Sequence, residues 1–197
     1  MKARGLPDPL LTISDGNQGV IASIETEFPL SWRQRCVRHK IENVLGAVPK
    51  GDHGSVRADL DQIFYGATSL EQARQALGDF RKKYRKVYPS AIDRLETDLE
   101  QTLTYYIFPA CHWRRIRTSN SLERLNLEIR RRLNVIGRHP HEDGCLSLVF
   151  AVAMGHADRN RAFRATEIIR ALWQRLRDKK EDLVWQLQNA VIEKKAA

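Results

Sequence analysis

Hydrophobic positions along most of the chain recur at the three- and four-residue spacing of amphipathic helices. The clearest stripe lies within residues 120–136 and consists of Leu122, Leu125, Ile129, Leu133 and Ile136. Asn120 is a favoured N-cap residue, Glu123 follows three positions later as in a capping box, and Gly137 ends the run. The pattern predicts an amphipathic helix of about four turns.

Elsewhere the pattern predicts two short strands and several further helices. Residues 10–14 form an apolar, β-prone run that ends at Asp15-Gly16, which indicates a buried strand followed by a turn; a second strand is expected at residues 31–36. Helices are expected at residues 18–28, 37–48, 56–65, 69–88, 90–105 and 144–155, and one helix or a pair at residues 160–197. The predicted fold class is therefore α/β and mostly helical.

The charge of the chain indicates a polyanionic partner. Its formal net charge is +9, from 33 lysines and arginines against 24 aspartates and glutamates. Arginine gathers in and before the predicted helix at residues 120–136, as Arg114, Arg115, Arg117, Arg124, Arg130, Arg131 and Arg132. Because the arginine fork suits phosphate oxygens, nucleic acid is the leading candidate, and an acidic membrane surface is a weaker one.

Cysteine usage and hydrophobicity indicate a cytoplasmic protein with no membrane partner. The three cysteines, Cys36, Cys111 and Cys145, are scattered and odd in number, which fits a reducing compartment better than a disulfide framework. The longest apolar run, residues 145–154, has about half of the length that a bilayer requires. The first eleven residues contain no signal-peptide hydrophobic region.

Two carboxylates are candidates for metal binding. Asp15 is expected at the carboxyl end of a strand, where open α/β sheets bind ligands, and Glu123 is expected on the cationic helix. Such a pair could hold Mg²⁺, which takes a few carboxylates and leaves its other positions to water and phosphate oxygen. The simpler interpretations are that Asp15-Gly16 is an ordinary turn and that Glu123 only caps its helix. Cys36 and His39 have the spacing of half a zinc site, for which structural packing is the simpler interpretation.

Two stretches of the chain resemble the Mutator-type transposases of bacterial insertion sequences. The first reads Asp15-Gly16-x-x-Gly19-Val20, continues through Phe28-Pro29 and ends in Gln34-x-Cys36-x-x-His39. The second reads WRRIRTSNSLERLNLEIRRR, followed by VIGRHP and an apolar helix. The resemblance covers roughly residues 10–157, with Asn17-Gln18 where the family usually has His-Lys after the Asp-Gly pair.

This resemblance implies a ribonuclease H-like catalytic core of the DDE type, with an all-helical insertion between its second and third acids. Asp15 would be the second metal-binding acid and Glu123 the third, with Mg²⁺ as the cofactor, and Cys36 and His39 match the family's C-x2-H motif. The implied organisation has four parts. They are a partial core at residues 1–48, the helical insertion at 49–110, the third-acid helix and a core helix at 111–158, and a helical tail at 159–197.

The resemblance also implies DNA partners, which are the terminal inverted repeats and the target, a nucleoid-associated location in a bacterium, and a homo-oligomer for the full-length protein. The family's first Asp lies well upstream of the second, and Asp8 is too close to Asp15 to serve. The chain is therefore expected to be a C-terminal, truncated transposase that lacks the first acid and the N-terminal DNA-binding region. Two alternatives remain, a non-catalytic basic DNA-binding remnant and a helical interaction protein.

Overall fold

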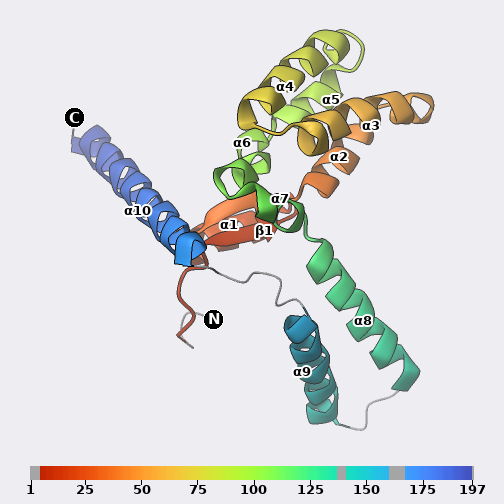
Figure 1. Cartoon of the computed structure of the whole chain (residues 1–197), viewed down its shortest axis with the longest axis vertical. Coiled ribbons are helices and arrows are strands. Elements are labelled where there is room, and N and C mark those ends of the chain that lie inside the picture. The colour runs from red at the N-terminus through yellow and green to blue at the C-terminus, as the bar shows by residue number, and fades with distance from the viewer. Residues whose placement is uncertain (1–4, 137–140, 160–166, 197) are drawn as a thin grey trace. The chain divides into compact units, whose positions relative to one another are not determined.

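The computed structural model describes residues 5–136, 141–159 and 167–196. In this part of the chain most residues are helical, and β1 (Leu11–Ser14) and β2 (Trp32–Arg35) form a small two-stranded sheet (Figure 1). Both predicted strands are confirmed, and so is the mostly helical α/β class.

The chain divides into two compact units. The first combines Met1–Thr118 with Trp173–Ala197, and the second is Ser119–Leu172. The expected four-part division at residues 48, 110 and 158 follows family organisation and stays a prediction.

The sheet belongs to a β-α-β unit in which α1 (Gln18–Glu27) connects the two strands. The strands are parallel, and their register pairs Ser14, the last residue of β1, with Arg35, the last residue of β2. Because parallel neighbours point the same way, the turn that starts at Asp15 and the end of β2 share one edge of the sheet.

Helices occupy most of the rest of the first unit. They are α2 (Val37–Leu45), η2 (Lys50–Asp52), α3 (His53–Asp61), the π-helix η3 (Gln62–Gly66), α4 (Leu70–Tyr84), α5 (Pro89–Glu96), α6 (Leu99–Thr102), η4 (Thr104–Ile107) and α7 (Ala110–Ile116). Their apolar faces meet in the main hydrophobic core, where Leu60, Phe64, Leu77 and Ile92 are almost completely buried. This burial is the main stabilising contribution to the helical block.

The predicted start of α4 agrees with the structure, whereas one predicted helix is interrupted. α4 begins after Ser69, the predicted N-cap, whose Oγ accepts a hydrogen bond from the Gln72 amide at 3.2 Å. The single helix predicted at residues 90–105 is wrong, because the chain breaks at Thr97 and Asp98. Asp98 adopts a left-handed backbone with φ of 53°. Asp tolerates this conformation better than most residues, and no glycine or proline marks the break in the sequence.

A buried glutamine fastens β2 to the helices that follow. Gln34 has no exposed surface, and its Nε2 donates to the Thr102 carbonyl oxygen at 2.9 Å. Its Oε1 accepts a hydrogen bond from the Tyr105 amide at 2.7 Å. Both polar atoms are therefore satisfied, as burial requires.

A buried lysine makes a second such joint, between α2 and α5. Lys40 is 2% exposed, and its Nζ donates to the carbonyl oxygens of Arg94, at 2.6 Å, and of Thr97. Burial disfavours the charged form and lowers the pKa of Lys40 to about 8. A neutral amine still carries two N–H donors, which is the number that the two carbonyls use.

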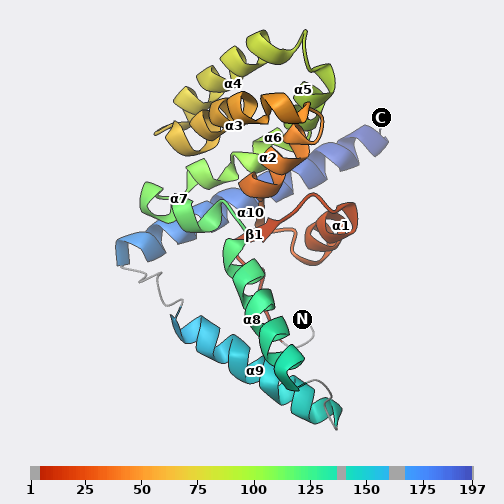
Figure 2. The same ribbon diagram turned by 90° about the vertical axis from the view of Figure 1, so that its right-hand side faces the viewer.

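The second unit contains α8 (Asn120–Ile136) and α9 (Glu142–Arg159), which lie side by side in Figure 1 and Figure 2. The predicted cap is shifted by one residue. The Glu123 amide donates to the Ser119 carbonyl oxygen at 3.1 Å, so Ser119 is the N-cap and Asn120 the first helical residue. No residue of α8 is buried, although its hydrophobic stripe has the expected helical spacing.

The last helix, α10 (Glu167–Ala196), is a single helix over the described part of the C-terminal region. From Trp173 onward it belongs to the first unit. The Trp32 indole donates to the Leu176 carbonyl oxygen at 2.9 Å, and the Lys180 ammonium lies 5.1 Å from the centre of the same indole ring. No helix in the described residues is both long and apolar enough to span a membrane.

Candidate functional site

Asp15 lies directly after β1, as predicted, and its side chain is exposed. Its Oδ1 accepts a hydrogen bond from the Asn17 amide at 3.1 Å, so the carboxylate also closes the turn before α1. Asp15 therefore closes the turn while its exposed carboxylate stays accessible to a ligand, so the two interpretations do not exclude each other.

Arg35 ends the neighbouring strand and is buried, with 7% of its surface exposed. Its Nε and Nη1 have no hydrogen-bond partner among the described residues. Burial lowers the pKa of the Arg35 guanidinium, and the charges of Asp98 and then Asp15 act in the opposite direction. Gly16 lies against this side chain, because a Cβ there would be 2.4 Å from Arg35 Nη2. Any larger residue at position 16 would displace the guanidinium.

The C-x2-H pair lies next to the same edge of the sheet. Cys36 follows β2 directly, is completely buried, and donates from its amide to the Ser14 carbonyl oxygen at 2.8 Å. His39 lies one turn further on α2 and is half-buried. The described residues contain no group of three or more His, Cys, Asp or Glu that could hold a metal ion. Cys36 thus has a clear packing role at the junction of strand and helix.

Glu123 lies in the first turn of α8, in the second unit, whereas Asp15 lies in the first unit. Its Oε1 accepts a hydrogen bond from the Ser119 hydroxyl at 2.9 Å. The carboxylate therefore supports the start of the helix, and the charge is favoured there by the helix dipole. The side chain remains partly exposed.

The predicted DNA-binding arginines fall into two groups. Six of them are exposed, on α7 or α8, and they are Arg114, Arg115, Arg124, Arg130, Arg131 and Arg132. Two of these six, Arg131 and Arg132, form ion pairs with Glu128 at 3.8 and 2.9 Å. Arg117 is different, because its Nη1 donates to the Phe64 carbonyl oxygen at 3.1 Å and its guanidinium lies 4.4 Å from the Tyr65 ring centre.

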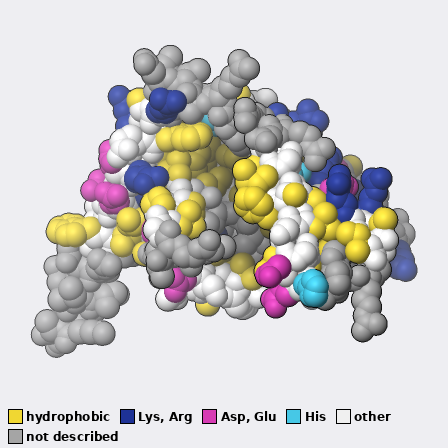
Figure 3. Space-filling view, turned by 90° about the horizontal axis from the view of Figure 1, so that it is seen from below, with side chains coloured by type: hydrophobic (Ala, Val, Ile, Leu, Met, Phe, Trp, Pro, Cys, Tyr) yellow, Lys and Arg dark blue, Asp and Glu magenta, His cyan; other side chains and the backbone are white. Residues whose placement is uncertain are grey.

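The surface of the second unit is hydrophobic as well as cationic. Exposed apolar side chains on α8 and α9 are Leu122, Leu127, Val135, Ile136, Leu146, Phe150 and Met154. In the space-filling view, hydrophobic side chains reach the surface beside Lys and Arg side chains (Figure 3).

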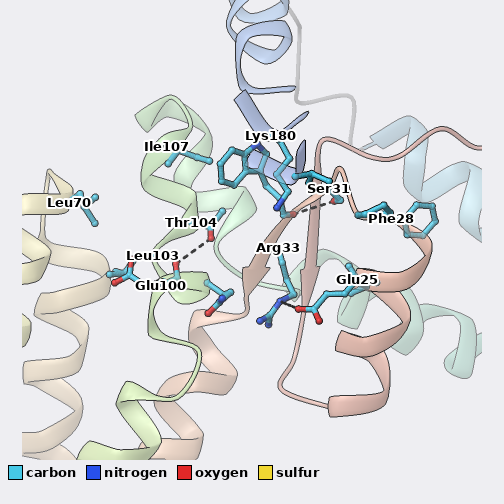
Figure 4. Close-up of a pocket in the computed structure, with 15 residues that line it drawn as sticks. Glu25, Phe28, Ser31, Arg33, Leu70, Glu100, Leu103, Thr104, Ile107 and Lys180 are labelled. Atoms are coloured by element: carbon cyan, nitrogen blue, oxygen red, sulfur yellow. Dashed lines mark hydrogen bonds and ion pairs between the residues drawn. The ribbon is translucent and has the colours of Figure 1, made fainter. Parts of the chain in front are cut away.

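A pocket of about 470 Å³ lies at the other end of β2 from Arg35 and is lined in part by Trp32, Arg33 and Lys180 (Figure 4). Arg33 is held there by ion pairs with Glu25, at 3.5 Å, and Asp98, at 3.3 Å. Partial burial lowers the pKa of Lys180. The pocket contains none of the residues predicted for catalysis.

Sequence reasoning did not foresee the burial of three residues around the site, Gln34, Arg35 and Lys40, although Gln34 belongs to the first family motif. All three are polar or charged residue types, which are usually exposed, so the pattern gave no reason to bury them. The available signal was their position, since Gln34 and Arg35 lie near the end of the strand predicted at residues 31–36 and Lys40 lies on the first turns of the helix that follows.

The fold and the site define a basic, mostly helical protein built on a β-α-β unit, with an acidic residue at the carboxyl end of its first strand. The family model described as "Transposase, Mutator family" matches residues 1–162, and the chain belongs to this family. The resemblance inferred from the sequence is thereby confirmed.

Curated relatives carry the same kind of name. The transposase for insertion sequence element IST2 of Acidithiobacillus ferrooxidans is 39% identical over 133 residues, which are 67% of this chain and 45% of the relative. The transposase for IS6120 of Mycolicibacterium smegmatis is 33% identical over 168 residues, which are 85% of this chain and 52% of the relative. The transposase for ISRM5 of Rhizobium meliloti is 35% identical over 154 residues, which are 78% of this chain and 38% of the relative. The chain spans about half the length, or less, of these relatives.

Proposed function

We propose that this chain is part of a transposase that cleaves and joins DNA strands at the ends of an insertion element. The observation that carries the proposal is the match to the Mutator transposase family over residues 1–162. The names of the relatives, each a transposase for an insertion sequence element, support it. The net charge of +9 is suited to a nucleic-acid partner.

We place β1, α1, β2 and α2 in a ribonuclease H-like core and the helices from η2 to η4 in an insertion between the second and third acids. Three features support this placement. The strands are parallel, Asp15 follows the first of them, and the described elements between β2 and Glu123 are all helical.

Asp15 and Glu123 are the proposed metal-binding acids. Their chemistry fits Mg²⁺, because each offers carboxylate oxygen from a side chain that reaches solvent, and the ion leaves other positions to water and phosphate oxygen. A bound ion would activate the attacking hydroxyl and stabilise the leaving oxygen. Arg124, Arg130 and Arg131 would neutralise phosphates on the bound strands.

The metal proposal can be tested on this chain by Mn²⁺ binding, followed by electron paramagnetic resonance. Asp15→Asn and Glu123→Gln should each weaken binding, because each removes a ligand charge. Glu128→Gln is the matched control, since Glu128 is on the same helix but pairs with arginines. Equal Mn²⁺ binding by all four proteins would contradict the assignment. In a full-length relative, the change aligned with Glu123→Gln should abolish strand cleavage.

A second candidate function is non-catalytic DNA binding. It is favoured by the exposed arginines of α7 and α8. A gel-shift assay on this chain, repeated over a range of salt concentrations with and without Mg²⁺, distinguishes non-catalytic DNA binding from transposase activity. Steeply salt-dependent binding without Mg²⁺-dependent nicking would favour this function.

A further inference from the structure

A buried arginine without a partner lies at the edge of the sheet where Asp15 is found. Arg35 is 7% exposed, and its Nε and Nη1 donate to nothing in the described residues. Buried N–H donors almost always have a hydrogen-bond partner, and an unpaired buried charge is strongly unfavourable. An arrangement of this kind suggests that the partner is a ligand.

A second unsatisfied group lies beside it. Ser14 and Arg35 are register partners at the ends of β1 and β2, so their side chains project from the same face of the sheet. The Ser14 hydroxyl oxygen is also buried without a hydrogen-bond partner in the part of the chain that the structure describes. A hydroxyl and a guanidinium are therefore both available for one acceptor group.

The acids near Arg35 leave its donors unused. Asp15 and Asp98 act on the guanidinium through their charges. However, Asp98 Oδ1 already accepts a hydrogen bond from Arg33, at 3.3 Å, and Asp15 Oδ1 accepts one from the Asn17 amide. The charges of these acids oppose the effect of burial on the pKa of the guanidinium, but Nε and Nη1 stay without a hydrogen-bond partner in the described residues.

The backbone at this edge favours an anion. Three residues separate β1 from α1 and one residue separates β2 from α2, so the amino-terminal ends of two helices lie near the ends of the strands. Helix amino termini carry partial positive charge. Gly16 lets the turn lie against Arg35, since a side chain there would meet the guanidinium.

We propose that Arg35, with the Ser14 hydroxyl, binds a phosphodiester group of the DNA strand whose reacting phosphate lies next to Asp15. This proposal rests on the proposed transposase function and assigns a DNA phosphate to one residue of its site. A guanidinium matches phosphate oxygens in geometry and charge, and the bond is charge-assisted. Arg35 is thus a binding residue, and its buried donors gain a partner only when DNA is present.

The first test measures the affinity of the chain for a short DNA duplex by fluorescence anisotropy at several salt concentrations. Arg35→Gln should weaken binding by about tenfold or more and reduce the salt slope by about 0.9. The control Arg74→Gln removes the same charge from an exposed arginine that pairs with Glu100 at 2.8 Å. It should leave affinity and slope nearly unchanged.

A second variant keeps the charge. Gly16→Ala should displace the Arg35 guanidinium and weaken binding, whereas Gly78→Ala, where a Cβ meets open space, should not. Thermal melting of the free proteins separates binding from folding. Removal of a buried, unpaired charge in Arg35→Gln should leave the melting temperature unchanged or raise it.

A direct readout is the ¹⁵Nε–¹H resonance of Arg35, assigned by its absence in Arg35→Lys. DNA should shift this resonance, and inorganic phosphate at the same concentration should not. A shift with inorganic phosphate but not with DNA would overturn the proposal in favour of a free phosphate site. DNA binding with no Arg35 shift, and an Arg35→Gln affinity equal to wild type, would overturn it while leaving the transposase function intact. No DNA binding by the wild-type chain at low salt would overturn both.

Discussion

The two compact units use similar hydrophobic patterns in different ways. In the first unit, the stripes of α3, α4 and α5 meet in a continuous core with Leu60, Leu77 and Ile92 fully buried. In the second, α8 has an equally regular stripe, yet none of its residues is buried and Leu122 is 57% exposed. Periodicity therefore identifies the helix and its face, but burial depends on how many other elements cover that face.

The strongest test of this contrast is truncation of matching leucines. Leu77→Ala should lower the free energy of unfolding by about 2–5 kcal/mol, because it leaves a cavity in the first unit. Leu122→Ala should change it by about 0.5 kcal/mol or less, because more than half of this side chain is exposed. Urea unfolding of both variants measures the difference. Similar losses would mean that α8 is covered in solution.

The next effect is a pH dependence specific to the first unit. The pKa of Lys40 is about 8 in the folded chain against an ordinary value of 10.5, so the folded state opposes protonation. Below pH 8 the folded state bears the full free-energy cost of the buried charge, and this cost disappears as the pH rises toward 10.5. The wild-type chain should therefore gain stability, on the order of 1–3 kcal/mol, across this window relative to Lys40→Met.

Urea unfolding at several pH values between 8 and 10 gives this difference. The comparison with Lys40→Met removes the contribution of tyrosines whose pKa is raised by burial, such as Tyr105. Those tyrosines make the stability of the folded state fall as the pH rises, because they lose their protons at a lower pH in the unfolded chain than in the folded chain. A parallel pH profile for both proteins would show that Lys40 keeps its ordinary pKa.

A smaller effect separates two arginines that the sequence treats alike. Arg117→Gln should lower the free energy of unfolding by about 1 kcal/mol, through loss of the hydrogen bond to the Phe64 carbonyl, with little change in the salt slope of DNA binding. Arg130→Gln should leave stability within about 0.5 kcal/mol and reduce the slope by about 0.9. Denaturant titration and anisotropy provide the two values. The assignment would be wrong if Arg117→Gln reduced the salt slope and Arg130→Gln lowered the stability.

The smallest expected effect concerns the helix caps. Ser69→Ala should lower stability by about 1 kcal/mol, because the Gln72 amide loses its partner at the start of a packed helix. Ser119→Ala should mainly increase hydrogen exchange in the first turn of α8, where tertiary packing is sparse. Exchange measured by mass spectrometry distinguishes global from local loss. Equal protection of α8 in both variants would argue against the Ser119 cap.

Much of the fold could be predicted because local signals and tertiary structure agree. β1 ends at its Asp-Gly turn, and α4 starts at Ser69, each through a residue with a specific backbone or capping role. The break at Asp98 could not be predicted, since its left-handed backbone is not signalled by a glycine or proline. The cap of α8 was displaced by one residue because Ser119 and Asn120 are both favourable types.

The candidate site was predicted less completely than the fold. The family pattern pointed to Asp15 and Glu123, and these roles remain proposals. Arg117 looked like part of a surface arginine cluster, whereas its guanidinium is used inside the first unit. Arg35 looked like an ordinary strand residue. Charge and spacing alone do not show which arginine is buried, because that depends on contacts between residues far apart in the chain.

Gln34 and Lys40 contact main-chain atoms of the helices that they hold, rather than side chains. A carbonyl oxygen is present whatever side chain its residue carries, so exchange of Arg94 or Thr97 for another residue leaves the acceptors in place. The outer helices can therefore accumulate substitutions while the joint to the strands persists. Members of this family that diverge in sequence would therefore keep the shape of this region longer than they keep its residues.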